Sequence, residues 1–213
     1  MTREVFMRAA LDFSRSRGGK DERERLFAIL QMQMQNNDSN IRDVLATCVK
    51  EEDIIKAFTW ASNKNDVDLL QAFFDIGVNV DAIDGDGACA LMDASSNGHE
   101  ESVHWFLERD AKVDTQDNHG MTALMYACEF GEPRIVEMLL QKNANPDIQD
   151  NVGRTGLMWA SMEGYKEVVQ LLLSYNANTG LTNNEGKTAF DLAKNEEIKE
   201  MLLNHVNTSY VLK

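Results

Sequence analysis

Residues 117–149 read DNHGMTALMYACEFGEPRIVEMLLQKNANPDIQ, and residues 150–182 read DNVGRTGLMWASMEGYKEVVQLLLSYNANTGLT. The two stretches have the same length and carry similar residue types at matching places. Each contains one member of a glycine series in which successive residues are 33 positions apart: Gly87, Gly120, Gly153 and Gly186. A fixed period of this length indicates a stack of copies of one supersecondary unit and argues against a single closed globular core.

Each copy is predicted to contain two helices followed by a loop. Thr122 can cap the first helix with its hydroxyl group, and Gly131 can end that helix in a backbone conformation that is costly for other residues. Pro133 stands just inside the second helix, where its missing N–H has no consequence. Asn143 begins a turn-rich loop that leads to the next copy. Because one such unit cannot bury its apolar face alone, neighbouring units must stack.

These copies resemble ankyrin repeats. The family's opening pattern, D-x-x-G-x-T-P-L-H-x-A, is matched by Asp117, Gly120, Thr122, Leu124 and Ala127, and again by Asp150, Gly153, Thr155, Leu157 and Ala160. The motif's proline is replaced by alanine or glycine, and its histidine is replaced by Met92, Met125 and Met158 in three copies. That histidine usually bonds between neighbouring repeats, so we expect this stack to depend more on the packing of flexible thioethers.

The resemblance implies an all-α solenoid of helix-turn-helix units with hairpin-like loops. It predicts an ankyrin-repeat domain over residues 51–213, with repeats at 51–83, 84–116, 117–149, 150–182 and 183–206. The last copy is short and rich in charged residues, which is typical of a polar end cap. Residues 1–50 are predicted to be helical but lie outside the repeat register. They form either a helical N-terminal cap or a degenerate repeat preceded by a free first helix.

The net charge of −14 is distributed unevenly over the 213 residues. Residues 1–50 carry nine Lys and Arg against seven Asp and Glu, a balance of +2, whereas the remainder carries twelve against twenty-eight, a balance of −16. The acidic part would repel nucleic acid and anionic membranes over most of its surface. A basic partner segment would complement it. The alternative interpretation is that the acidic faces only keep a long solenoid in solution.

The compartment is predicted from what the sequence lacks. No apolar run is long enough to span a bilayer, and the first residues lack the apolar core of a signal peptide. Three cysteines give an odd count without a CxxC pair, which favours a reducing compartment. We therefore expect a cytoplasmic protein, with the nucleus as the alternative.

The sequence carries no recognisable catalytic signature. It has no P-loop, no GxSxG, no HExxH and no glycine-rich dinucleotide loop. The four histidines do not cluster at metal-ligand spacing, and Cys128 is interpreted as a small core residue rather than a nucleophile. We therefore expect no enzymatic activity, no cofactor and no metal site.

In the ankyrin family, partners usually lie along a concave face made of loop tips and the exposed side of each first helix. The resemblance implies that the loop tips of this face contain Asp86, Asn118, His119, Met121, Val152 and Arg154. It implies that the helices contribute Tyr126, Glu129, Phe130, Trp159, Met162 and Glu163. Phe130 and Met162 are expected to be exposed. Tyr126 and Trp159, with Trp60 in the first copy, either line the interface or pack between helices.

The sequence thus predicts a non-catalytic protein–protein interaction module, either an adaptor or a regulatory subunit. It would bind a basic or amphipathic partner segment on the concave face, anchored by apolar contacts of Phe130, Met162 and Met121. The acidic residues of the set would determine charge preference. The alternative is a structural assembly protein that self-associates through its N-terminal helices. Neither nucleic acid nor a membrane is expected as a partner.

Overall fold

The computed structural model describes residues 51–75 and 77–211. The predicted N-terminal cap, its alternative as a degenerate repeat, and the self-associating helices all fall on residues 1–50, which lie outside the described residues. The described part contains ten α-helices and no strand, with one isolated antiparallel bridge between Ile83 and Cys89. The prediction of an all-α helical solenoid is confirmed.

The helices form five helix-turn-helix pairs. These are α4 (Glu51–Asn63) with α5 (Val67–Asp75), α6 (Ala90–Ser96) with α7 (Glu100–Leu107), α8 (Ala123–Phe130) with α9 (Pro133–Gln141), α10 (Gly156–Glu163) with α11 (Lys166–Ser174), and α12 (Ala189–Leu192) with α13 (Glu196–Val211). The domain boundary at residue 50 and the five repeat boundaries stay predictions.

The chain divides into two compact units, residues 1–90 and 91–213. In the described part of the first unit, α4 packs against α5, and the rings of Phe58 and Phe73 meet edge to face with centroids 6.1 Å apart. The hydroxyl of Ser62 donates a hydrogen bond of 2.6 Å to the carbonyl of Ala90. Both aromatic rings are buried, so they form the centre of this small core.

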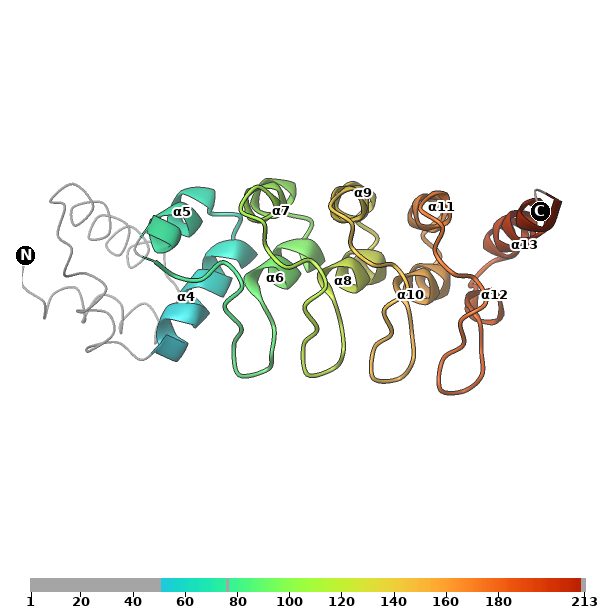
Figure 1. Cartoon of the computed structure of the whole chain (residues 1–213), viewed down its shortest axis with the longest axis horizontal. Coiled ribbons are helices and arrows are strands. Elements are labelled where there is room, and N and C mark those ends of the chain that lie inside the picture. The colour runs from blue at the N-terminus through green and yellow to red at the C-terminus, as the bar shows by residue number, and fades with distance from the viewer. Residues whose placement is uncertain (1–50, 76, 212–213) are drawn as a thin grey trace, which may run out of the picture. The chain divides into compact units, whose positions relative to one another are not determined.

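The second unit is built of two rows of helices, with the loops on one side (Figure 1). The inner helix α10 packs against both α8 and α12, and the outer helix α11 packs against both α9 and α13. Met92, Met125 and Met158, which occupy the place of the motif histidine, are at most 2% exposed. These thioethers are therefore core residues, and the greater dependence of the stack on their packing stays a prediction.

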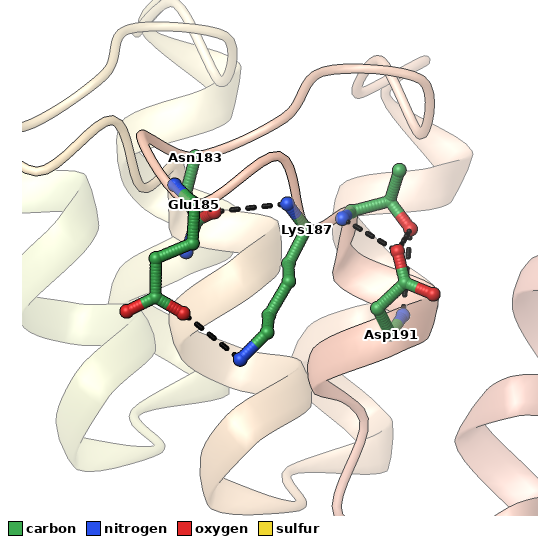
Figure 2. Close-up of polar contacts among 5 residues, drawn as sticks. Asn183, Glu185, Lys187 and Asp191 are labelled. Atoms are coloured by element: carbon green, nitrogen blue, oxygen red, sulfur yellow. Dashed lines mark hydrogen bonds and ion pairs between the residues drawn. The ribbon is translucent and has the colours of Figure 1, made fainter.

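The first helices begin and end as the sequence predicted. Thr122 and Thr155 cap α8 and α10, because their hydroxyl oxygens accept the backbone N–H groups of Met125 and Met158. Gly131 ends α8 in the left-handed region with φ of 75°. In the last copy, the capping is reciprocal: Thr188 accepts from the backbone of Asp191, whose carboxylate accepts the N–H of Thr188 in return (Figure 2).

Each loop of the second unit is held by the first residue of its repeat. Oδ1 of Asp150 accepts the N–H groups of Val152 and Arg154 at 3.0 and 2.7 Å. Asn183 does the same for Glu185 and Lys187 in the last copy, where Figure 2 shows the bond to Lys187. An amide oxygen can therefore hold the turn as well as a carboxylate oxygen can.

Neighbouring loops are bonded to one another in register. The N–H of Asn151 donates to the carbonyl of His119, and its side-chain Nδ2 donates to the carbonyl of Asn118. Asn184 repeats this arrangement one copy later, with its N–H on Val152 and its Nδ2 on Asn151. These bonds fix the spacing of the loops and of the helices that follow them.

Candidate functional site

Six side chains on α8 and α10 form the candidate interaction face. On α8, Glu129 and Phe130 follow Tyr126 by three and four positions, so the three residues lie on one side of the helix. The same spacing recurs on α10, and the two helices pack against each other. We call this set the α8–α10 face: Tyr126, Glu129, Phe130, Trp159, Met162 and Glu163.

The two aromatic rings of the face are fixed by hydrogen bonds to the loops. The phenol of Tyr126 donates to Oδ2 of Asp117 at 2.6 Å, and Nε1 of Trp159 donates to Oδ2 of Asp150 at 3.1 Å. Both aromatic side chains are half-buried. Part of each side chain is therefore accessible, and the interface role of the two residues stays a prediction. Both rings are held in place before any partner binds.

Sequence reasoning missed the part played by Asp117 and Asp150, which it treated only as the first residues of their repeats. Each is buried, and each lies nine residues before the aromatic residue that it orients. The signal was partial: an aspartate opens the copies that carry Tyr126 and Trp159, whereas the copy that carries Trp60 at the same helix position opens with Glu51. The copy before them has Asp93 at that position and therefore no ring there.

The face brings negative charges close to one another. Burial raises the pKa of the Glu129 carboxyl above its ordinary value, and the Glu163 carboxylate raises it further. Arg154 opposes this shift, and Asp150 adds to it. Burial also raises the pKa of the Tyr126 phenol, reinforced by its hydrogen bond to Asp117. Burial is the largest cause of both shifts, and nearby carboxylates add to it.

Arg154 is the cation whose charge opposes the rise in the pKa of Glu129, and its guanidinium lies on an aromatic ring. Its guanidinium carbon lies 4.7 Å from the centroid of the Trp159 ring, and its Nε is buried without a hydrogen-bond partner. Among residues 51–75 and 77–211, no carboxylate lies within ion-pair distance of it. The arginine predicted at a loop tip is thus a half-buried side chain stacked on the face.

The expected exposure of the apolar anchors is confirmed for one residue only. Phe130 is 51% exposed, and Val152 at the neighbouring loop is 49% exposed. Met162 is half-buried, so it offers less surface than we expected.

The prediction that Met121 is an exposed anchor is wrong, because its side chain is only 6% exposed. Its N–H donates to Oδ1 of Asp117, and its carbonyl accepts the N–H of that same residue. Met121 therefore stands in the stem of the turn, directly before the capping Thr122, and not at the tip.

The remaining predicted residues lie where the loops turn. Asn118 and His119 are exposed, and their carbonyls accept hydrogen bonds from Asn151. Asp86 is also exposed, but it belongs to the first compact unit, where its N–H donates to Asp84. The structure therefore brings together the predicted residues on α8 and α10, whereas Asp86 belongs to the other compact unit.

Across the part of the chain that the structure describes, no group of three His, Cys, Asp or Glu side chains is arranged to hold a metal ion. No helix in that part is long and apolar enough to cross a membrane. Cys89 and Cys128 are buried, and burial raises the pKa of the Cys128 thiol. A buried thiol with a raised pKa is a poor nucleophile.

Comparison with protein families gives one match. The family model described as ankyrin repeats, in three copies, matches residues 58–150 and 142–212, which together make up more than half of the chain. A comparison with curated proteins finds no matching relative.

Proposed function

This chain belongs to the ankyrin-repeat family, whose repeats are generally protein–protein interaction modules, and on that basis we propose that it is a non-catalytic adaptor or regulatory subunit. Its partner is a polypeptide with a basic or amphipathic segment, which binds along the concave face that contains the α8–α10 face. The family is typically non-catalytic, and the proposal assigns no reaction to this chain.

The exposure of Phe130 is the observation that carries the proposal. A phenylalanine that is 51% exposed at the end of α8 leaves apolar area in water, and its covering by a partner would be favourable. It shares its helix face with two half-buried residues, Tyr126 and Glu129. Aromatic groups in the middle of an interface, with charged groups around them, are the composition of a binding hot spot.

The charge of the chain supports a basic partner. Residues 51–213 carry a balance of −16, and the pKa of Glu129 is raised first by burial and then by the nearby charges of Glu163 and Asp150. A basic segment would be steered toward this surface and would relieve the repulsion on arrival. The proposal places the chain in a reducing compartment, the cytoplasm or the nucleus, because the sequence has an odd number of cysteines and no CxxC pair.

The test is a pull-down that compares two surfaces of the same unit. Phe130→Ala removes the exposed ring from the α8–α10 face, while Tyr175→Ala removes a ring that is 38% exposed next to α11 in the outer row. Thermal melts first establish that both variants are folded. The proposal predicts that a polypeptide recovered with the unmodified chain and with Tyr175→Ala is lost or strongly reduced with Phe130→Ala. Equal recovery with all three proteins would refute the assigned face.

A further inference from the structure

We propose that the group recognised at this face is an arginine side chain of the partner, whose guanidinium lies between the carboxylates of Glu129 and Glu163. An apolar residue next to this arginine covers Phe130. The inference rests on the proposed function and specifies the partner's chemistry.

Charge complementarity selects a cation. Glu129 and Glu163 stand on adjacent packed helices, and the charge of Glu163 makes ionisation of Glu129 less favourable. Asp150, at the start of the intervening loop, adds to this repulsion, and the single counter-charge of Arg154 offsets it in part. A second cation between the two glutamates would favour their ionised forms, whereas a neutral or anionic group would not.

The site already holds one guanidinium, which favours arginine over lysine. The guanidinium carbon of Arg154 lies over the Trp159 ring, 4.7 Å from its centroid, and the charge of Arg154 acts on Glu129. In the preceding repeat, Tyr126 takes the place of Trp159, but the position that matches Arg154 is occupied by Met121, whose side chain is buried. The repeat that contains Tyr126 therefore has an aromatic ring with acidic neighbours, but it lacks the arginine that the next repeat provides as Arg154.

Guanidinium chemistry fits these surroundings. An arginine side chain is planar, is weakly hydrated, and has five N–H donors that can reach two carboxylates at once while the plane lies on an aromatic ring. A lysine ammonium is a compact, strongly hydrated charge, and it loses more hydration on entering a half-buried site. The flanking apolar residue follows from Phe130, which lies four residues after Tyr126 and 51% exposed on the same side of α8.

The experiment uses side-chain analogues, so that it does not depend on the identity of the partner. The 15N-labelled full chain is titrated with N-acetyl-L-argininamide, with the lysine analogue, and with the citrulline analogue, which has the same shape without the charge. We expect saturable shifts of the Trp159 indole signal and of the Glu129 and Glu163 amides, with a millimolar dissociation constant. The lysine analogue should bind at least about threefold more weakly, and the citrulline analogue at least about tenfold more weakly.

A charge-matched pair of variants localises the effect. Glu129→Gln with Glu163→Gln should raise the dissociation constant of the arginine analogue at least about tenfold. Glu167→Gln with Glu200→Gln changes the net charge equally at two exposed positions on the outer helices α11 and α13, and should leave the constant unchanged. Removing repulsion between Glu129 and Glu163 does not threaten folding.

Several results would overturn the arginine assignment: no saturable shift at these residues up to about 50 mM analogue, equal binding of the citrulline or lysine analogue, or equal weakening by the outer pair. The proposed function has a separate readout. If the pull-down depends on Phe130 while the arginine analogue does not bind, the interaction face stands and the recognised group is not arginine.

Discussion

The indole Nε1–H of Trp159 donates a hydrogen bond of 3.1 Å to Oδ2 of Asp150. The other oxygen of this carboxylate accepts the N–H groups of Val152 and Arg154, the residues that make the turn at the start of the repeat. One aspartate therefore holds both the loop and the ring that α10 presents on the candidate face. The stability of the repeat and the orientation of its binding surface depend on the same side chain.

Replacing Asp150 should separate these two roles. Asp150→Asn keeps an Oδ1 that can hold the turn, as Asn183 does in the last copy, but it presents an NH2 donor to the Trp159 N–H. We expect this variant to lose about 1 kcal/mol of unfolding free energy. Asp150→Ala also leaves two loop N–H groups without their acceptor and should lose about 3 kcal/mol in total. Urea denaturation measures both, and equal losses would contradict the division of labour between the two oxygens.

A side chain at Gly131 should lower the free energy of unfolding for two reasons, a positive φ and the close approach of Tyr165, and their contributions can be measured separately. Its φ is 75°, and a Cβ atom there would lie 2.6 Å from Cε1 of Tyr165. Gly186 has almost the same φ, 76°, but a Cβ atom would meet nothing within 4 Å. Gly186→Ala should therefore lose only the backbone term of about 1–2 kcal/mol, and Gly131→Ala should lose clearly more.

Adding Tyr165→Ala to Gly131→Ala provides the control for this comparison. The second substitution removes the ring that the new methyl group would meet, so part of the lost stability should return. If the two glycine variants unfold at the same urea concentration, the close approach of Tyr165 does not contribute.

The hydroxyl of Thr122 is expected to stabilise the start of α8. Thr122→Val keeps the shape of this buried side chain but removes the oxygen that accepts the N–H of Met125. The loss of unfolding free energy should be about 1–2 kcal/mol, as for other N-cap residues. Thr182→Val, at an exposed loop position, is the control and should leave stability nearly unchanged. Similar losses in both variants would mean that the hydroxyl does not act as a cap.

The raised pKa of Glu129 predicts a pH dependence with a definite sign. A carboxyl whose pKa is higher in the folded state than in the unfolded state lowers stability at pH values above its unfolded pKa, and this loss disappears as the pH falls below that value. Glu129→Gln should therefore unfold at a higher urea concentration than the unmodified chain at pH 7, with the advantage vanishing below about pH 4.

Carbon-detected NMR titration of the Glu129 carboxyl tests the cause directly. Glu163→Gln removes the nearby negative charge and should bring the pKa of Glu129 closer to its ordinary value. Glu167→Gln on α11 should leave the pKa of Glu129 unchanged. A Glu129 pKa at or below the ordinary value in the unmodified chain would remove the electrostatic basis of the proposed arginine site.

The sequence predicted the fold in some detail because the repeat signals are local. Thr122, Gly131 and Pro133 each act within a few residues of their own position, and all three lie at the helix ends as expected. The exposure of single side chains was less predictable. Met121 is buried in the stem of a turn whose tip is two residues away, and the cover over Gly131 comes from Tyr165 in the next repeat. The contact between Gly131 and Tyr165 is therefore not encoded by the copy to which Gly131 belongs.

The candidate face shows the same limit. Its residues could be placed on α8 and α10 from helical spacing alone, because positions three and four residues apart share a side of a helix. The bonds from Tyr126 to Asp117 and from Trp159 to Asp150, and the stacking of Arg154 on Trp159, join a loop to a helix across a turn. Side-chain distances of this kind are set by the bend between loop and helix, which periodicity does not specify.

Photo-cross-linking from the candidate face tests the central claim most directly. A benzoylphenylalanine replaces Phe130 in one protein and Tyr175, beside the outer helix α11, in another, and both are irradiated in an extract of cells that express the chain. The account predicts a discrete polypeptide adduct from position 130, which Glu129→Gln with Glu163→Gln suppresses, and none from position 175. Adducts of equal yield from both positions, or from position 175 alone, would contradict it.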